Sequence, residues 1–380
     1  MPVDRLTVSN YRPLRDLRLD LEPVTVLVGA NGCGKSNTYR ALGILHAAAQ
    51  GRLAEAFADE GGIASMTWSG LAKKRDEIRS VRISIEVDFD RYAYRLACGV
   101  PIPSPSMFQL NPEVKEEFLG VYVEGQRAPV PLCERQGHIV TLRDEHGNRE
   151  TRSEPLDPTQ SMLVQLVDPY RYPELSLVRS LLAGWRFHHQ FRTDPDSPLR
   201  KPALAVRSPV LSDDGRNLAA TLQTIAEMNG SAALDAAIGK AFSGCRLGIA
   251  PRDGNLLALT WHRPDLARPL EATELSDGTL RFLALAAALL TPRPPTLLVL
   301  NEPESGLHRD VIPALADLIA AAAEQTQVIV TTHLTDLADG IRERTGTEPT
   351  PLVLVKGQTQ VGGTVDDEGR RQIRFGRSKR

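Results

Sequence analysis

The most constraining feature of this chain of 380 residues is the segment Gly29-Ala-Asn-Gly-Cys-Gly34-Lys35-Ser36, called the P-loop below. It satisfies the phosphate-binding pattern of a glycine, four further residues and then Gly-Lys-Ser in full. The segment follows the apolar run Val24–Val28 and precedes an amphipathic stretch over Lys35–Ala49. The sequence therefore predicts a strand, a glycine-rich turn and a helix, which is the context that this pattern requires.

The residue types of the P-loop predict a nucleotide site. Glycines let successive backbone N–H groups point inward around phosphate oxygens, and the helix N-terminus adds the positive end of its dipole. We expect Lys35 to reach the β- and γ-phosphates and the Ser36 hydroxyl to coordinate Mg²⁺.

Two further apolar runs end in polar residues. Leu297–Leu300 is followed by Asn301-Glu302-Pro303, and Val328–Thr332 is followed by His333. Ligands bind at the carboxyl edge of parallel α/β sheets, where such strands end. We expect Glu302 to polarise an attacking water, Asn301 to help hold the Mg²⁺ shell and His333 to lie near the same edge.

A short polar turn, Glu274-Leu-Ser276-Asp277-Gly278, opens an apolar helix predicted over Ser276–Leu290. Ser276 is suited to cap that helix. By itself the turn, called the signature turn below, is only a capping signal. Its position just before the Asn301-Glu302 strand favours a functional interpretation.

The order of these motifs resembles that of the ABC-class ATPase heads, and within that class the RecF, SMC and OLD lineage. Three phrases carry the resemblance, which covers the first hundred residues and those after about Asp213: Leu6-x-Val8-x-Asn10-Tyr-Arg12, Val28 to Asn37, and Glu302-Pro-Glu304-Ser-Gly-Leu-His308.

The resemblance implies ATP and Mg²⁺ as cofactors and an ATP-dependent homodimer. ATP would lie between two copies of the chain, which close on ATP and open after hydrolysis. The implied site residues are the Walker A loop (Gly29, Ala30, Asn31, Gly32, Cys33, Gly34, Lys35, Ser36 and Asn37), the signature residues Ser276 and Gly278, the Walker B residues Asn301 and Glu302, the D-loop residues Ser305 and Gly306, and the switch histidine His333.

The family pattern also includes a Q-loop glutamine that contacts nucleotide and metal, between the first lobe and the signature turn. Gln190, at the end of the strand predicted over Gly184–Phe191, is the first candidate and Gln165 is the alternative. His188 and His189 precede Gln190, but adjacent residues of a strand face opposite sides, which argues against a metal site built on this pair.

Two departures from the family pattern concern charge. Asp277 stands where the signature usually has glycine, so its carboxylate must point away from the phosphates or meet a cation. Asn301 replaces the usual Walker B aspartate and removes one formal charge, which lowers metal affinity or turnover. Because Glu302 is intact, we predict slow ATP hydrolysis rather than an inactive site.

The fold class that these patterns predict is α/β: a P-loop NTPase of the ABC head type, with a mixed sheet, an antiparallel β lobe and a helical insertion. We predict an N-terminal ATPase lobe over residues 1–100, an insertion subdomain over 101–182, a C-terminal ATPase lobe over 183–365 and a basic tail over 366–380.

Composition limits the partners and the compartment. The net charge of −2 gives no argument from bulk charge for nucleic acid or membrane. Four scattered cysteines, no secretory leader and no apolar run of bilayer length predict a cytoplasmic protein. The resemblance suggests DNA repair or defence against foreign DNA, and the alternative is control of a separately encoded effector without direct DNA binding. The basic tail is either a solvated terminus or an arm that contacts phosphates.

Overall fold

The structure, a computed structural model, describes residues 1–69, 82–101, 107–108, 110–143, 149–152 and 156–362, so the predicted basic tail lies outside it. The chain divides into two compact units. Unit 1 comprises Met1–Leu21, Leu27–Gly184 and Thr350–Arg380, and unit 2 comprises Glu22–Val26 and Trp185–Pro349. Strand β3 (Val24–Val28) begins in unit 2 and ends in unit 1.

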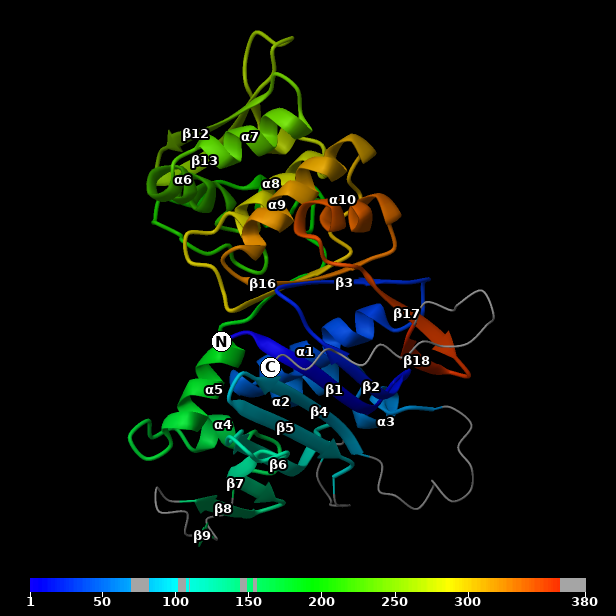
Figure 1. Cartoon of the computed structure of the whole chain (residues 1–380). Coiled ribbons are helices and arrows are strands. Elements are labelled where there is room, and N and C mark those ends of the chain that lie inside the picture. Colours follow the sequence, from blue (N-terminus) through cyan, green and yellow to red (C-terminus); the bar gives the residue numbers. More distant parts are fainter. Residues whose placement is uncertain (70–81, 102–106, 109, 144–148, 153–155, 363–380) are drawn as a thin grey trace, which may run out of the picture. The chain divides into compact units, whose positions relative to one another are not determined.

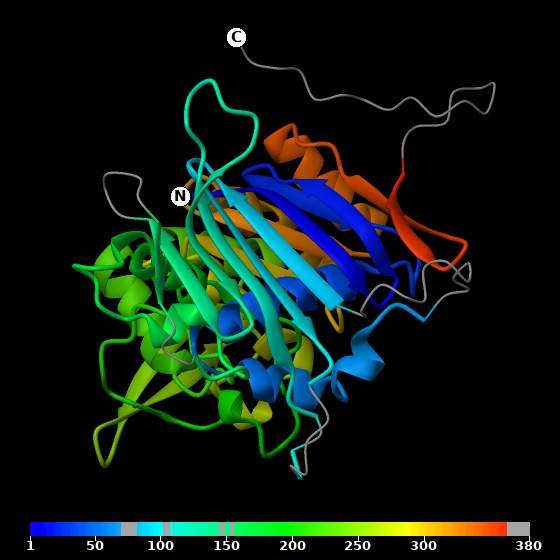
Figure 2. The ribbon, with the colours of Figure 1, turned by 90° about the horizontal axis from the view of Figure 1, so that it is seen from below.

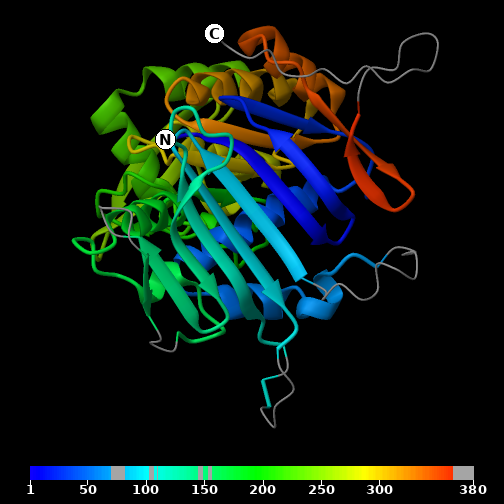
Figure 3. The same cartoon turned by 60° about the horizontal axis from the view of Figure 1, so that its bottom comes forward.

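Unit 1 is built on an antiparallel sheet of order β2-β1-β4-β5-β6-β7-β8-β9. Figures 2 and 3 show these strands side by side, from dark blue β1 and β2 through cyan β4 and β5 to blue-green β6 and β7. The strands are β1 (Val3–Tyr11), β2 (Leu14–Asp20), β4 (Arg82–Phe89), β5 (Tyr92–Gly99), β6 (Glu113–Val121), β7 (Val130–Gln136), β8 (Ile139–Arg143) and β9 (Arg149–Arg152).

Alternating apolar residues explain why this sheet has one buried face. Ile83, Ile85 and Val87 of β4 are each at most 1% exposed, and Leu6 and Val8 of β1 are fully buried. Helix α1 packs against β1, β4 and α5. The helices of unit 1 are α1 (Lys35–Ala49), α2 (Leu53–Asp59), α3 (Ile63–Met66), α4 (Met162–Gln165) and α5 (Pro173–Ala183).

A strand hairpin near the end of the described chain completes unit 1. Strands β17 (Thr350–Val355) and β18 (Gln358–Val361) are antiparallel to each other. Strand β17 also runs parallel to the end of β3, with Thr350 opposite Leu27 and Pro351 opposite Val28. This hairpin therefore brings residues from late in the sequence beside the strand that leads into the P-loop.

Unit 2 contains a parallel sheet and a small antiparallel one. The parallel order is β10-β15-β16 followed by the first residues of β3, and the second sheet has the order β11-β13-β12 with β14 beside β13. The strands are β10 (Arg186–His188), β11 (Ala203–Leu204), β12 (Arg246–Arg252), β13 (Leu256–His262), β14 (Leu270–Glu271), β15 (Leu297–Asn301) and β16 (Gln327–Thr332).

Helices cover the parallel sheet of unit 2, and Figure 1 shows α8, α9 and α10 next to one another. All five residues of β15 and all six of β16 are buried, as expected for strands covered on both faces. The helices are α6 (Leu218–Asn229), α7 (Ala232–Ala241), α8 (Asp277–Leu289), α9 (Ile312–Ala323) and α10 (Thr335–Thr345), with short 3₁₀ turns η1 (Pro198–Arg200), η2 (Ala272–Glu274) and η3 (Arg309–Val311). No helix in the described ranges combines the length and the apolar character needed to cross a bilayer.

The α/β, ABC-type head fold that the sequence predicts is confirmed, and helix α1 has the predicted bounds. The sequence predicts a further helix over Asp213–Met228 with Asp213 or Asp214 as its N-cap, but α6 begins only at Leu218, so this cap was wrong. The Asp214 carboxylate instead accepts hydrogen bonds from Ser212 Oγ and Arg216 N, which hold this segment in a turn. The strand predicted over 184–191 is limited to β10.

The two compact units differ from the predicted division into two ATPase lobes, an insertion and a tail. That division was drawn from the positions of the motifs and stays a prediction. Residues 101–184 belong to the same unit as the N-terminal residues. The reason is that β6 pairs along the length of β5, from Tyr92 opposite Val121 to Gly99 opposite Glu113, so the insertion extends the existing sheet.

A buried ion pair joins the sheet of unit 1 to the segment that leads into α4. Glu117 on β6 accepts hydrogen bonds from Tyr94 Oη, Ser161 Oγ and the backbone N–H of Met162. Arg135 Nη1 lies 3.6 Å from Glu117 Oε2, and both side chains are fully buried. Burial raises the pKa of Glu117, and these hydrogen bonds and the Arg135 charge oppose that shift.

We predict that Arg135→Met destabilises the chain by about 3–5 kcal/mol, because it leaves the Glu117 carboxylate buried without its cation. The guanidinium also donates to the carbonyls of Gly137, Gln160 and Asp157, at 2.8, 2.6 and 2.9 Å, and these acceptors lose their donor as well. The free energy of unfolding in urea measures the effect. The control Arg263→Met, in an exposed pair with Asp265, should leave the free energy of unfolding close to that of the wild type, since exposed ion pairs contribute little to stability. Equal losses in the two variants would contradict the prediction.

Candidate nucleotide site

The P-loop has a backbone that requires glycine at two positions. Gly29 and Gly34 have φ of 156° and 109°. A Cβ would lie 2.4 Å from the carbonyl oxygen of Leu352 at Gly29 and 2.2 Å from Thr359 Oγ1 at Gly34. Any side chain at either position would therefore collide with the β17–β18 hairpin.

Lys35 closes the P-loop on itself. Its side chain donates to the carbonyl oxygens of Gly29, at 2.7 Å, and of Ala30, at 3.1 Å, and the residue is 3% exposed. The N-cap of α1 is Gly34, which has no side chain to bond the first turn, so the N–H groups of Lys35 and Ser36 can face an anion. A cation and an uncapped helix N-terminus at a glycine turn fit the phosphates of a nucleotide.

The rest of the predicted Walker A residues lie around this turn. Cys33 is buried, and its carbonyl accepts a hydrogen bond of 2.7 Å from Thr359 Oγ1. Asn37 Oδ1 accepts from Arg12 Nη1 at 3.4 Å. Ser36 is half-buried and therefore accessible, as a ligand to Mg²⁺ must be, and the remaining residues Ala30, Asn31 and Gly32 are exposed.

The other predicted site residues lie in unit 2, where the register of parallel strands brings them to one edge. His188 on β10 is opposite Leu300 on β15, and Asn301 at the end of β15 is opposite Thr331 on β16. The residues that follow these strands therefore emerge together at the carboxyl edge. They are His189, Gln190, Glu302 and His333.

Asn301 is held on both sides of its amide. Its Nδ2 lies 2.6 Å from Nδ1 of His189, and its Oδ1 accepts from Thr331 Oγ1 at 2.6 Å. Since an amide N–H can only donate, Nδ1 of His189 is the acceptor and the proton of a neutral ring is on Nε2. An aspartate in this position would have no proton to give His189. The amide of Asn301, which stands where the family pattern has aspartate, can thus donate the hydrogen bond that Nδ1 of His189 accepts.

Glu302 is fixed by its backbone. It has φ of 50°, and its N–H donates to the carbonyl oxygen of Thr331 at 2.9 Å. Its side chain is 25% exposed, and Oε1 lies 3.9 Å from Nδ1 of His333. The strained backbone turns a partly accessible carboxylate toward the switch histidine, an arrangement suited to a general base.

Glu304 is a second carboxylate at this edge, and sequence reasoning gave it no role. Its Oε1 accepts from Thr332 Oγ1 and from the backbone N–H of His333, at 3.3 Å, and lies 3.4 Å from Nδ1 of His333. Its Oε2 is buried and has no hydrogen-bond partner in the described part of the chain. A buried carboxylate in this position orients the His333 ring and leaves Nε2 facing away from it.

The signature turn is held by an arginine that sequence reasoning missed. Ser276 caps α8 as predicted, with Oγ accepting from Thr279 N at 3.2 Å. Arg200 donates to the carbonyl oxygens of Ala272, Thr273 and Leu275, and its Nη2 lies 2.8 Å from Asp277 Oδ1. Asp277 therefore meets a cation, which was one of the two outcomes that its charge allowed.

The D-loop packs directly against the first turn of α8. A Cβ at Gly278 would lie 3.1 Å from the carbonyl oxygen of Gly306, and a Cβ at Gly306 would lie 1.8 Å from Arg281 Nη1. Arg281 donates to the carbonyl oxygen of Ser305 at 3.1 Å. Gly306, with φ of 74°, is thus required by both conformation and space.

The two candidates for the Q-loop differ in their surroundings. Gln190 is exposed and follows β10 at the same edge as Asn301. Gln165 lies in unit 1, where its amide bonds the backbone of Asp157 and Gln160. This placement favours Gln190, whose role stays a prediction.

Among the residues that the structure describes, no cluster of three or more His, Cys, Asp or Glu is placed to hold a metal. His188 is buried against Phe191, with ring centroids 5.2 Å apart, and His189 is exposed. Burial lowers the pKa of His188 to about 4.

Only some of the residues that sequence reasoning missed have a signal in the sequence. Glu304 lies two residues after Glu302, in a turn that follows a buried strand, and this position could have predicted a role at the edge of the sheet. Arg200 and His189 act through contacts with residues about seventy and more than one hundred positions away, and no local pattern marks them.

The fold and the motif order define an ABC-class P-loop ATPase head of the RecF and SMC type, as the sequence predicted. The chain belongs to the family described as "AAA domain, putative AbiEii toxin, Type IV TA system", whose model matches residues 127–339. A second family model, described as "AAA ATPase domain", matches residues 1–150. A comparison with curated proteins found no match.

Solved structures with this fold include SMC heads. A crystal structure of the SmcHead bound to the C-winged helix domain of ScpA is 14% identical, with a TM-score of 0.51 over 95% of this chain and 98% of that one. An Smc head domain with an extended coiled coil bound to the C-terminal domain of ScpA, derived from Pyrococcus furiosus, is 13% identical, with a TM-score of 0.52 over 95% and 96%. At these identities the likeness concerns the fold.

We predict that Glu304→Gln lowers kcat for ATP hydrolysis by about 10–100-fold while leaving ATP affinity unchanged, because it weakens the orientation of His333. Steady-state kinetics and nucleotide titration separate the two effects. The control Glu324→Gln, at an exposed position after α9, should behave like the wild type.

A double-mutant cycle decides whether Glu304 acts through His333. In a His333→Ala background, Glu304→Gln should cause little further loss, since residues that act as a unit are not additive. A full additional loss in that background would mean that Glu304 acts independently of the histidine.

Proposed function

We propose that the chain is an ATP-driven dimerisation switch, in which two copies enclose ATP and Mg²⁺, close, and open again after slow hydrolysis. The observation that carries this proposal is the N-terminus of α8. Ser276 is exposed there, at the positive end of a helix of 13 residues. Arg200 neutralises the neighbouring Asp277. This helix end is therefore suited to an anion presented by another molecule.

The residues would divide the work as follows. Lys35 exchanges the carbonyls of Gly29 and Ala30 for phosphate oxygens, and the N–H groups of the P-loop hold the same phosphates. Ser36 would hold Mg²⁺, with Asn301 and Gln190 in its outer shell, and the metal would neutralise charge on the phosphates. Glu302 accepts the proton of the attacking water, and His333 contacts the γ-phosphate.

Slow turnover follows from Asn301. Its amide is neutral and already bonds His189 and Thr331, so it contributes less to the Mg²⁺ shell than a carboxylate would. Glu302 keeps the charge needed to accept a proton.

The task of the switch is DNA repair or defence against foreign DNA in this proposal. Two facts support it: the resemblance to the RecF and SMC lineage, and the mention of a toxin–antitoxin system in the family description. Fold-level likeness alone would not assign such a task.

Control of a separately encoded effector, without direct DNA binding, is the second candidate. Two of the arginines on the antiparallel sheet of unit 1 are paired with carboxylates: Arg5 with Asp20 and Asp88, and Arg95 with Glu86. Paired arginines are poorly suited to neutralising DNA phosphates, which favours this candidate over direct DNA binding.

We predict that Glu302→Gln reduces ATP turnover by about 10²–10⁴-fold with ATP binding retained, because the carboxylate that accepts the proton is gone. Size-exclusion chromatography of this variant should give a monomer without nucleotide and a dimer with ATP and Mg²⁺. Adding Ser276→Arg should abolish the dimer but not ATP binding. Unchanged turnover, or a variant that stays monomeric with bound ATP, would refute the proposal.

Duplex DNA distinguishes the two candidate tasks. Direct action on DNA predicts a several-fold increase in the ATPase rate of the wild type and a DNA-dependent shift of the Glu302→Gln dimer in sizing. The second candidate predicts no change in either measurement. Repeating the assays at higher salt tests whether any effect is electrostatic.

A further inference from the structure

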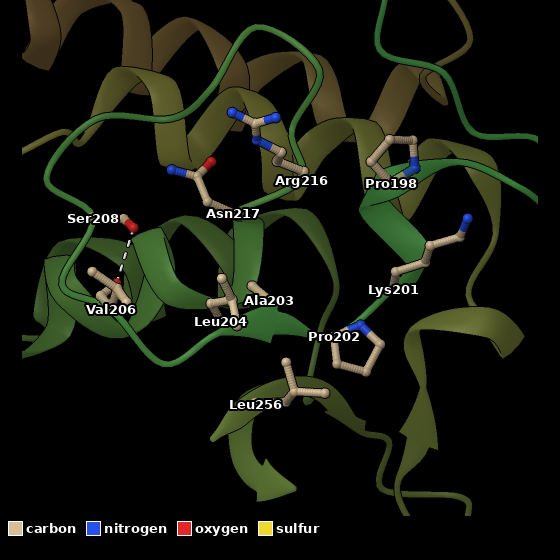
Figure 4. Close-up of a pocket in the computed structure, with 10 residues that line it drawn as sticks. All are labelled: Pro198, Lys201, Pro202, Ala203, Leu204, Val206, Ser208, Arg216, Asn217 and Leu256. Atoms are coloured by element: carbon tan, nitrogen blue, oxygen red, sulfur yellow. Dashed lines mark hydrogen bonds between the residues drawn. The ribbon is translucent and has the colours of Figure 1, made fainter. Parts of the chain in front are cut away.

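A cavity of about 500 Å³ lies in unit 2, away from the edge of the parallel sheet, and its lining comes from η1, β11, β13 and the segment before α6. Its volume is within the range of about 300–1,000 Å³ typical of ligand pockets. Figure 4 shows the residues that line it: Pro198, Lys201, Pro202, Ala203, Leu204, Val206, Ser208, Arg216, Asn217 and Leu256.

The lining is mostly apolar and continues onto the surface. Leu204 is 67% exposed and Val206 is 64% exposed, and both border the cavity. A leucine and a valine side chain left this open beside a cavity form an apolar patch of the kind that marks an interaction site. A small molecule confined to the cavity would leave both side chains in water.

The polar groups of the lining are already engaged within the chain. Asn217 donates to the carbonyl oxygen of Val210 and accepts from Ser212 N, and Ser208 Oγ donates to the carbonyl oxygen of Val206. These bonds hold the wall in place. Because these polar groups are already bonded within the chain, a ligand would be recognised through apolar contacts and charge.

The charge of the lining has one sign. Lys201 and Arg216 contribute two cations, and no carboxylate lines the cavity. Lys201 and Arg216 are both exposed, and the charge of Arg216 acts on the exposed carboxylate of Asp214. In Figure 4 the charged ends of Lys201 and Arg216 lie on the side of the cavity opposite Leu256. The cavity is therefore complementary to an apolar group that carries a carboxylate nearby.

The main chain beside the apolar patch is held within the chain. Strand β11 is two residues long and pairs with β13, and the carbonyl oxygen of Leu204 accepts a hydrogen bond from Val206 N at 2.7 Å. Recognition at this surface therefore depends on side chains.

We propose that this cavity and the exposed side chains of Leu204 and Val206 form a docking site for an acidic peptide segment of a partner protein. An apolar side chain of the segment fills the cavity beside Leu204 and Leu256, and carboxylates on either side of it meet Lys201 and Arg216. The proposal goes beyond the ATPase function and does not depend on it, because docking needs no nucleotide.

Selection of a displayed random peptide library on the full chain, without nucleotide, tests the proposal. The enriched peptides should combine Leu, Ile or Phe with neighbouring Asp or Glu. Fluorescence anisotropy with the enriched peptides should give dissociation constants that rise about tenfold or more in Lys201→Glu and in Leu204→Asp. Because both side chains are exposed, these variants should keep the thermal midpoint of the wild type.

The control is Arg246→Glu, which reverses an exposed cation of β12 outside the cavity and should change affinity less than twofold. Failure to enrich any peptide, enrichment of peptides without acidic residues, or equal affinity in all variants would overturn the proposal. So would loss of self-association in Leu204→Asp, which would make a second copy the occupant, or Lys201-dependent binding of a 20-base-pair duplex, which would make it nucleic acid.

Discussion

The parallel register of β10, β15 and β16 is the constraint on which the unit 2 half of the candidate site depends. Because Leu300 lies opposite His188 and Asn301 lies opposite Thr331, the three strands end level with one another. Each strand then releases its next residues at the same edge. A shift of one residue in the pairing register of β15 would move the side chains of Asn301 and Glu302 each to the other face from the one it now occupies. The amide of Asn301 would then be separated from His189.

The hydrogen bonds at this edge form a connected set rather than independent pairs. Asn301 joins β10 to β16 through His189 and Thr331, and Glu304 joins the D-loop side to Thr332 and His333. In such a set, a change to one group alters the partners available to the next. The amide at Asn301 consequently depends on its neighbours at this edge, since it requires a hydrogen-bond acceptor on His189 and a donor on Thr331.

Much of this architecture could be predicted from the sequence, because it rests on local signals. The P-loop, helix α1 and the cap at Ser276 each follow from a few neighbouring residues. The strand-end residues Asn301, Glu302 and His333 could be assigned to one edge because parallel strands share it.

What the sequence could not give are contacts between distant segments. Arg200 holds the signature turn through backbone carbonyls more than seventy positions away, and carbonyls leave no mark in a sequence. The same holds for β6, whose pairing with β5 merges the predicted insertion into the first sheet. The start of α6 was misplaced because the carboxylate of Asp214 serves a turn instead of a cap.

The support that Thr359 gives to the P-loop has a consequence for biosynthesis. Its hydroxyl bonds the carbonyl of Cys33 across a separation of 326 residues, and the hairpin that carries it also confines Gly29 and Gly34. While the chain is still on the ribosome, the glycine turn has emerged long before this hairpin exists. A nascent chain therefore lacks this support for the glycine turn until the residues around Thr359 have been made and the hairpin has folded.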